Sequence, residues 1–211
     1  MVDISKLESA LEETESNSRG SGDFTKFLYI PKGDVTFMPI ADDVAADGFS
    51  EFTADYFQDK GKVKVTKRRM VKVVVMDWPK DNVSNLPEDW QAAIHFMVMP
   101  ISAYKNLLKL AINKTGKGYD FATTDKKNKL VGDKNMVFTI NKSGSGLDTE
   151  YLVTFESTED TPRPTGEVVP ATTTLQLAAQ EYDDWKRRDA GLTDENAVNG
   201  SDDDSDMSSQ F

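Results

Sequence analysis

The 211-residue chain contains no cysteine and only one histidine, His95, which lies within an apolar run. Without thiols the chain forms neither disulfides nor thiolate metal sites, and a single imidazole is a poor basis for a histidine metal cluster or a catalytic triad. We therefore expect no metal and no cofactor.

No apolar run approaches the length of about 20 residues that a membrane-spanning helix needs, and the N-terminus lacks the basic-then-apolar pattern of a signal peptide. These absences favour a cytosolic protein.

Sequence motifs for catalysis are also missing. The chain has no phosphate-binding loop, no GxSxG nucleophile elbow and no dinucleotide fingerprint. Acidic side chains are abundant, but nothing in the sequence places two of them across a defined cleft, as glycoside hydrolysis would require. The pairs Asp42-Asp43 and Asp183-Asp184 and the triplet Asp202-Asp203-Asp204 could bind a divalent cation, although such acids are typical of solvated turns and helices. We expect that the protein is not an enzyme.

Charge is distributed unevenly along the chain, whose formal net charge is −11. Residues 189–211 hold seven acids and no Lys or Arg, residues 1–23 hold six acids against two cations, and residues 24–188 are therefore neutral in sum. Within this neutral body lies a run of seven cations without an acid, called here the basic strip: Lys60, Lys62, Lys64, Lys67, Arg68, Arg69 and Lys72. The low isoelectric point does not exclude nucleic acid as a partner, because a polyanion responds to local potential.

Hydrophobic patterning predicts a mainly β protein. Strands are expected where β-branched and aromatic residues are bounded by turn formers, at residues 27–30, 35–39, 49–57, 62–66, 71–76, 92–99, 134–141 and 148–156. The run at 92–99 is apolar throughout and predicts a strand buried on both faces, whereas the alternation at 62–66 predicts that Val63 and Val65 pack and the lysines face solvent. Helices are expected at 102–114, capped by Ser102, and at 173–188. This order fits a single small β-barrel with an inserted helix and flanking helices better than a parallel α/β sheet.

The two ends of the chain differ from the body in composition. Residues 3–15 carry apolar side chains at helical spacing among acids, and a flexible linker follows at 16–22. This amphipathic arm either packs on its own domain or docks on a neighbouring subunit or partner. The expected organisation is an arm and linker at 1–23, a core at 24–160, a linker and C-terminal helix at 161–188, and a disordered acidic tail at 189–211.

Cations and aromatic residues lie close together in the sequence. Proteins that hold single strands combine cations for phosphates with aromatic faces on which bases stack, each stack contributing about 1–3 kcal/mol. The expected DNA-binding residues are the basic strip together with Phe52, Tyr56, Phe57, Tyr104, Lys105, Lys117, Tyr119 and Lys142. Two alternatives stay open: the aromatic residues could belong to the core, and the glycine-rich segment after Lys142 could be a simple mobile turn.

Several segments in a shared order carry a resemblance to a known family. They are Phe27-Leu-x-Ile-Pro-x-Gly-x-x-x-Phe-Met-Pro39, the basic strip, Met99-Pro-Ile-Ser-Ala-Tyr-Lys105, Gly118-Tyr-Asp-Phe121, and Phe138-Thr-Ile-Asn-Lys-Ser-Gly-Ser-Gly-Leu-Asp-Thr-Glu-Tyr151. In this order the chain resembles phage replication single-stranded DNA-binding proteins over residues 24–156. The resemblance implies an OB-type barrel whose cleft binds single strands without sequence preference in replication, recombination and repair. It also implies a location in the host cytoplasm if the protein is phage-encoded.

The same resemblance implies a role for the acidic tail, which would recruit polymerase, helicase-loading or recombination proteins and compete with DNA for the cleft. The candidate partner-binding residues are Asp202, Asp203, Asp204, Asp206 and Phe211. From the residues alone, the tail is either a solubilising segment or an intramolecular mimic of DNA, with Phe211 as an apolar anchor for a partner.

Two features depart from the family pattern. Some members hold a structural zinc with Cys and His, and without cysteine that site cannot exist in its usual form, so the loop at 77–89 is expected in its place. The arm is acidic where some relatives use a basic arm on the adjacent subunit, which leaves cooperative assembly open. Two other functions remain as alternatives: a structural or virion-assembly component without DNA affinity, and an RNA-binding regulator.

Overall fold

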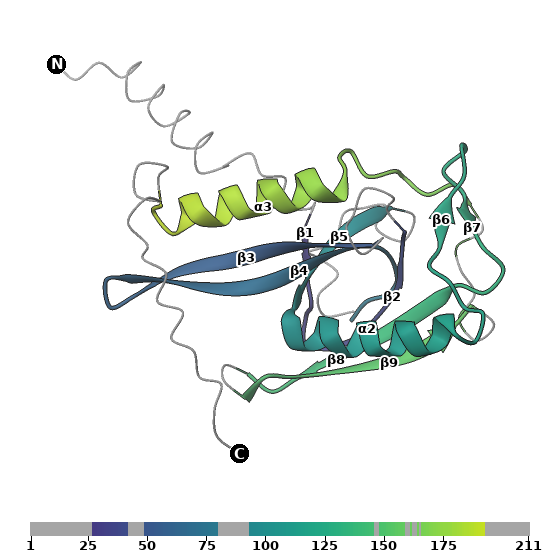
Figure 1. The fold of residues 1–211 in the computed structure, drawn as a ribbon, viewed down its shortest axis with the longest axis horizontal. Helices are drawn as coiled ribbons and strands as arrows, with labels where there is room; N and C mark the ends of the chain where they lie inside the picture. The colour runs from purple at the N-terminus through teal and green to yellow at the C-terminus, as the bar shows by residue number, and fades with distance from the viewer. Residues whose placement is uncertain are drawn as a thin grey trace.

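The computed structural model describes residues 27–41, 49–79, 93–145, 148–158, 161, 164 and 166–192 (Figure 1). Its strands are β1 (Phe27–Tyr29), β2 (Gly33–Pro39), β3 (Ser50–Asp59), β4 (Lys62–Asp77), β5 (Ile94–Pro100), β6 (Thr123–Thr124), β7 (Leu130–Val131), β8 (Met136–Ser143) and β9 (Glu150–Ser157). Its helices are α2 (Ile101–Thr115) and α3 (Leu175–Asp189). The described part of the chain is therefore mainly β with two helices, as the sequence predicts.

Strand β4, with 16 residues, is the centre of the main sheet. Along one edge of β4, its first part pairs with β3 and its last part pairs with β2. The other edge of β4 pairs with β5. Beyond β5 lies β1, in parallel, and beyond β2 lie β8 and β9, both antiparallel. The strand order is β1-β5-β4-β2-β8-β9, with β3 beside β4. Because β1 is parallel to its neighbour and the other pairs are antiparallel, the sheet is mixed.

Seven of the described strands form one open sheet and β6 and β7 form a separate pair, so the small barrel expected from the sequence does not close in this part of the chain. Helix α2 contacts β8 and β9 and also β4 and β5. It therefore packs against the last two strands of the sheet and against its central strands. Figure 1 shows α2 between the upper strands and β8–β9.

One hydrophobic core lies inside the sheet, against α2. Phe37, Val73 and Phe138 from three different strands meet Tyr104 and Leu107 of the helix, and all five are buried. Removing a side chain of this size from water contributes about 1.5–3 kcal/mol. This packing fixes the start of α2 against β4.

The opposite face of the sheet is covered by α3 and by the segment that carries β6 and β7. Under α3, Phe27, Met70 and Phe96 pack against Tyr182. A neighbouring cluster joins residues of β2, β4 and β8 to Leu130 and other residues of the covering segment. Strand β5 is consequently buried on both faces, as its apolar run predicts, and His95 is buried within it.

Two further expectations are wrong in detail. Val63 and Val65 are 37% and 54% exposed, because the outer half of β4 pairs only with β3 and extends past the described core. Helix α2 begins after Pro100, and no side chain caps it by a hydrogen bond, so Ser102 is not its cap.

Several expectations concern residues outside the described ranges. These are the arm at 1–23, most of the loop at 77–89, the pair Asp42-Asp43, and the tail residues Asp202, Asp203, Asp204, Asp206 and Phe211. Neither helix in the described ranges is both long and apolar enough to cross a membrane.

Candidate nucleic-acid interface

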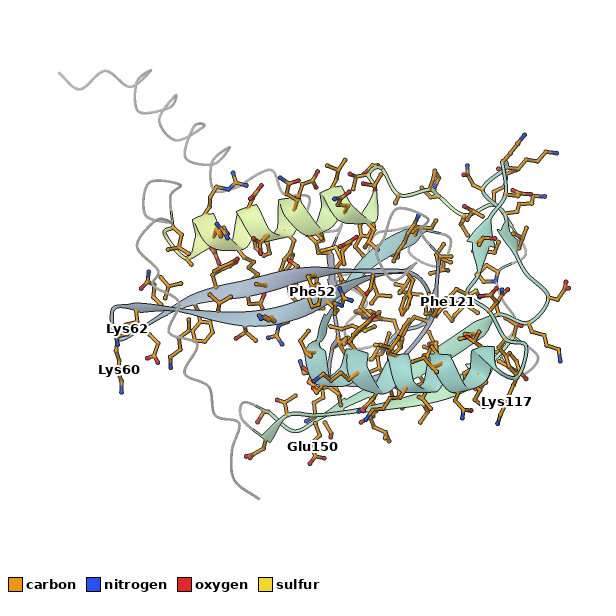
Figure 2. All side chains as sticks on the ribbon, in the orientation of Figure 1. Phe52, Lys60, Lys62, Lys117, Phe121 and Glu150 are labelled. Carbon is orange, nitrogen blue, oxygen red and sulfur yellow. The ribbon has the colours of Figure 1, made fainter. Side chains whose placement is uncertain are left out.

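Strands β3 and β4 form a hairpin that projects from the sheet (Figure 1). Its turn consists of Lys60 and Gly61, whose φ angles are 51° and 75°. Two successive residues with positive φ are the requirement of a type I′ turn, whose twist matches that of the flanking strands, and glycine adopts this conformation without strain. The basic strip therefore starts at the tip of the hairpin and follows β4 toward the core, and Figure 2 shows Lys60 and Lys62 at that tip.

The seven cations of the basic strip differ in their surroundings. Four lysines are exposed, namely Lys60, Lys62, Lys64 and Lys67. Lys64 forms an ion pair with Asp59, and Arg68 forms one with Asp55 at 2.6 Å between Nε and Oδ2. Lys72 is half-buried and Arg69 is buried. The exposed lysines thus concentrate positive potential on the outer half of the hairpin.

One face of the hairpin, called here the Phe52 face, combines aromatic, apolar and cationic side chains. In the β3–β4 register Phe52 lies opposite Arg69, Ala54 opposite Lys67, and Tyr56 opposite Val65, and directly opposed residues share a face. The Phe52 side chain is 66% exposed, and the Arg69 guanidinium lies 3.6 Å from the centroid of its ring. Phe57, 46% exposed, lies opposite Lys64 on the other face. The hairpin therefore presents an accessible aromatic ring beside lysines on each face.

Helix α3 is held on the hairpin by a chain of hydrogen bonds. The Tyr29 hydroxyl donates to the Tyr182 hydroxyl at 3.0 Å, and the Tyr182 hydroxyl donates to Asp55 Oδ1 at 2.5 Å. Arg68 Nε donates to the second oxygen of the same carboxylate at 2.6 Å. Burial raises the pKa of Tyr29 to about 12, and burial followed by the bond to Asp55 raises the pKa of Tyr182 well above its usual range. Both phenols therefore stay protonated donors at neutral pH.

Tyr56 joins the end of α3 to the hairpin. Its hydroxyl donates to both carboxylate oxygens of Asp183 at 3.1 Å and accepts from Arg187 Nε at 3.2 Å, and burial raises its pKa. Close by, Gln58 Nε2 donates to the carbonyl oxygen of Ala190 at 3.1 Å. Tyr56, expected from the sequence to contact DNA, is thus engaged in holding α3.

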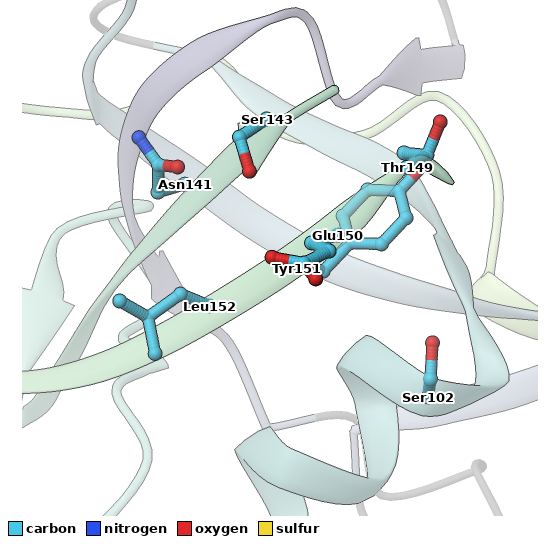
Figure 3. A pocket seen from close by; sticks show the side chains of 7 residues that line it. All are labelled: Ser102, Asn141, Ser143, Thr149, Glu150, Tyr151 and Leu152. Atoms are coloured by element: carbon cyan, nitrogen blue, oxygen red, sulfur yellow. The ribbon is translucent and has the colours of Figure 1, made fainter. Parts of the chain in front are cut away.

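A polar pocket opens beside the start of α2, and Figure 3 shows its lining. Its volume is about 530 Å³, and its lining residues are Ser102, Asn141, Ser143, Thr149, Glu150, Tyr151 and Leu152.

Tyr104, in the first turns of α2, is only 5% exposed and its hydroxyl accepts from Ser50 Oγ at 3.0 Å, while Lys105 is exposed. Lys142 donates from Nζ to the carbonyl oxygen of Ile30 at 3.2 Å. Tyr104 therefore packs in the core and offers no open ring face.

The structure brings most of the expected DNA-binding residues to the hairpin and the start of α2, but separates two of them. Lys117 and Tyr119 follow the end of α2, and Figure 2 shows Lys117 at the opposite end of the described chain from Lys60. The Tyr119 ring packs edge-on against Phe155, with 5.1 Å between centroids. These two residues do not share a surface with the hairpin.

Sequence reasoning did not select Val65 or Tyr151, which the structure places on the Phe52 face and in the pocket. The signal for Tyr151 is the alternation of Tyr151, Val153 and Phe155 along β9, which turns all three toward the core side. Val65 gives no such signal, because its exposure depends on how far the hairpin projects.

In the described ranges, no group of three or more His, Asp or Glu side chains is placed to hold a metal ion. Comparison with family models, with curated proteins and with solved structures gives no match for this chain. Fold and surface define the protein as a mainly β chain with an open mixed sheet, from which a basic hairpin with exposed aromatic residues projects.

Proposed function

We propose that this protein binds single-stranded DNA without sequence preference and coats it during phage DNA replication, recombination and repair. The observation that carries the proposal is the projecting hairpin, where the rings of Phe52 and Phe57 are exposed next to the lysines of the basic strip. The cations neutralise phosphates and release counterions, and the rings stack on bases. Since every base has a stacking face and every nucleotide a phosphate, neither contact depends on sequence.

The order of several sequence segments also supports the proposal. The ordered segments from Phe27 to Tyr151 resemble phage replication single-stranded DNA-binding proteins. All but Gly118–Phe121, which lies between α2 and β6, fall largely on β1, β2, β4, α2, β8 and β9. We further propose that the sheet is an OB-type fold with α2 as its inserted helix. In this proposal the single strand of DNA lies between the hairpin and the start of α2, where Lys105 adds a cation.

We also propose that the acidic tail competes with DNA and recruits replication proteins. The last described residue, Leu192, follows α3, whose end is tied to the hairpin through Tyr56 and Gln58. The next residues, 193–211, carry six acids and no Lys or Arg. A polyanion tethered there acts at high local concentration on the same cations that a DNA strand needs.

Titration of the full chain with a fluorescent oligo-dT at several salt concentrations tests the proposed function. Four exposed lysines predict that log K falls with log salt at a slope of about −3, at about −0.7 for each phosphate neutralised on a single strand. An oligo-rU and a DNA duplex of equal charge are the comparison ligands. Absence of binding, or binding that ignores salt, contradicts the proposal and favours an assembly component. Tighter binding of the RNA favours an RNA-binding regulator, because the 2′-hydroxyl is the group that distinguishes the two.

A further inference from the structure

Arg69 differs from the rest of the basic strip in its surroundings. It is the buried member, with 9% exposure, whereas the other six are exposed or half-buried. Its guanidinium lies over two rings, 3.6 Å from the centroid of Phe52 and 4.8 Å from that of Tyr104. Its partner Phe52 is 66% exposed and lies directly opposite it in the β3–β4 register. A cation in this position faces aromatic rings, while the exposed lysines face solvent.

The ring behind Arg69 is itself fixed. Tyr104 is 5% exposed and its hydroxyl accepts from Ser50 Oγ at 3.0 Å. Its ring lies 6.0 Å from that of Phe49, which stacks on Phe121 with 4.2 Å between centroids. Five planar groups thus form a continuous series that starts at the exposed Phe52, passes through the core and ends at the half-buried Phe121. Its members are Phe52, Arg69, Tyr104, Phe49 and Phe121. Figure 2 labels the two ends of this series.

We propose that Arg69 is a positioning residue that holds the Phe52 ring as a platform for one base, and that it does not bind a phosphate. The inference rests on the proposed binding of single strands. The guanidinium covers one face of the Phe52 ring and leaves the other for a base. An exposed ring that is already held in place loses less conformational entropy when a ligand stacks on it. Lysine cannot replace arginine in this role, because the contact uses a planar, weakly hydrated group.

The test compares the oligo-dT affinity and the salt slope of five proteins with those of wild type: Phe52→Leu, Arg69→Lys, Arg69→Gln, the double variant Phe52→Leu/Arg69→Lys, and Lys67→Gln as the exposed-cation control. Thermal unfolding of each variant sets a temperature at which all are folded. Phe52→Leu should weaken binding about 5- to 150-fold, the range for one base–aromatic stack. Arg69→Lys should also weaken oligo-dT binding, although the charge is kept. In the Phe52→Leu background the same substitution should cause no further loss of affinity.

The salt slope separates positioning from phosphate binding. Lys67→Gln should reduce the magnitude of the slope by about 0.7, the loss of one phosphate contact, whereas Arg69→Gln should leave it at the wild-type value. An Arg69→Gln slope that falls as far as that of Lys67→Gln overturns the inference, and so does an Arg69→Lys protein that binds as wild type. An equal Arg69→Lys loss with and without Phe52 also overturns it. In all these outcomes wild-type binding stands; only a wild type that binds no oligo-dT overturns the proposed function as well.

Discussion

Tyr182 links the C-terminal helix to the hairpin although its partner Asp55 is 127 residues away in sequence. Replacing Tyr182 with Phe removes the donor to Asp55 and the acceptor of Tyr29 in a partly buried contact. We expect this change to lower the free energy of unfolding by about 1–3 kcal/mol, the contribution of a hydrogen bond to a charged carboxylate and of one between two hydroxyls. Urea denaturation measures it. Tyr119→Phe is the matched control, because the Tyr119 hydroxyl has no hydrogen-bond partner among the described residues; an equal loss in both variants contradicts the assignment.

The same pair of tyrosines predicts a loss of stability at high pH. An unfolded tyrosine releases its proton near pH 10, whereas burial raises the pKa of Tyr29 to about 12 and that of Tyr182 well above its usual range. Above pH 10 the unfolded state therefore binds fewer protons than the folded state. The contribution of the two tyrosines to the free energy of unfolding is complete below pH 10, and it decreases as the pH rises further. Urea unfolding between pH 9 and about 12 measures the slope. Tyr182→Phe should flatten the slope, and an unchanged slope contradicts the account.

At the scale of elements, the hairpin depends on its turn. Gly61 has a φ of 75° and no atom lies within 4 Å of the position a Cβ would take, so only backbone strain opposes a larger residue there. Gly61→Ala should lower the free energy of unfolding by about 1 kcal/mol, the cost of a left-handed conformation for a residue with a Cβ. Gly166→Ala is the matched control, because Gly166 has equally open space and no such φ. Thermal unfolding compares the two, and equal midpoints contradict the turn assignment.

The elements were largely predictable because their signals are local. Turn formers and β-branched runs predicted the positions of the strands from Phe27 onward. The apolar run around His95 predicted a strand that is covered on both faces. The exposure of Val65 was not predictable, since alternation predicts two faces but not whether a layer covers either of them. The contact of Phe52 with Arg69 depends on strand register, and that of Tyr182 with Asp55 on tertiary packing, neither of which the pattern of residues specifies.

At the scale of the whole molecule, charge is divided between a basic hairpin and the acidic residues 193–211, which follow a helix whose end is bonded to that hairpin. A chain ending at Leu192 keeps α3 and its hydrogen bonds but loses the six acids of residues 193–211. It should bind oligo-dT more tightly than the full chain, with the larger difference at low salt, where screening is weakest. A full-length chain with those acids changed to Asn or Gln is the control and should match the shortened one. Equal affinity of the full and shortened chains contradicts competition by the tail.

The most direct test of the central claim compares the salt dependence of oligo-dT binding between two variants of equal charge. One carries Lys62→Gln, Lys64→Gln and Lys67→Gln on the hairpin, and the other carries Lys126→Gln, Lys127→Gln and Lys129→Gln at the β6–β7 turn, where the lysines are also exposed. Figure 1 shows these two regions at opposite ends of the described chain. We expect the hairpin variant to lose affinity and the magnitude of its slope to fall by about 2, while the other variant binds as wild type. Equal loss in both variants, or a greater loss at the β6–β7 turn, would contradict it.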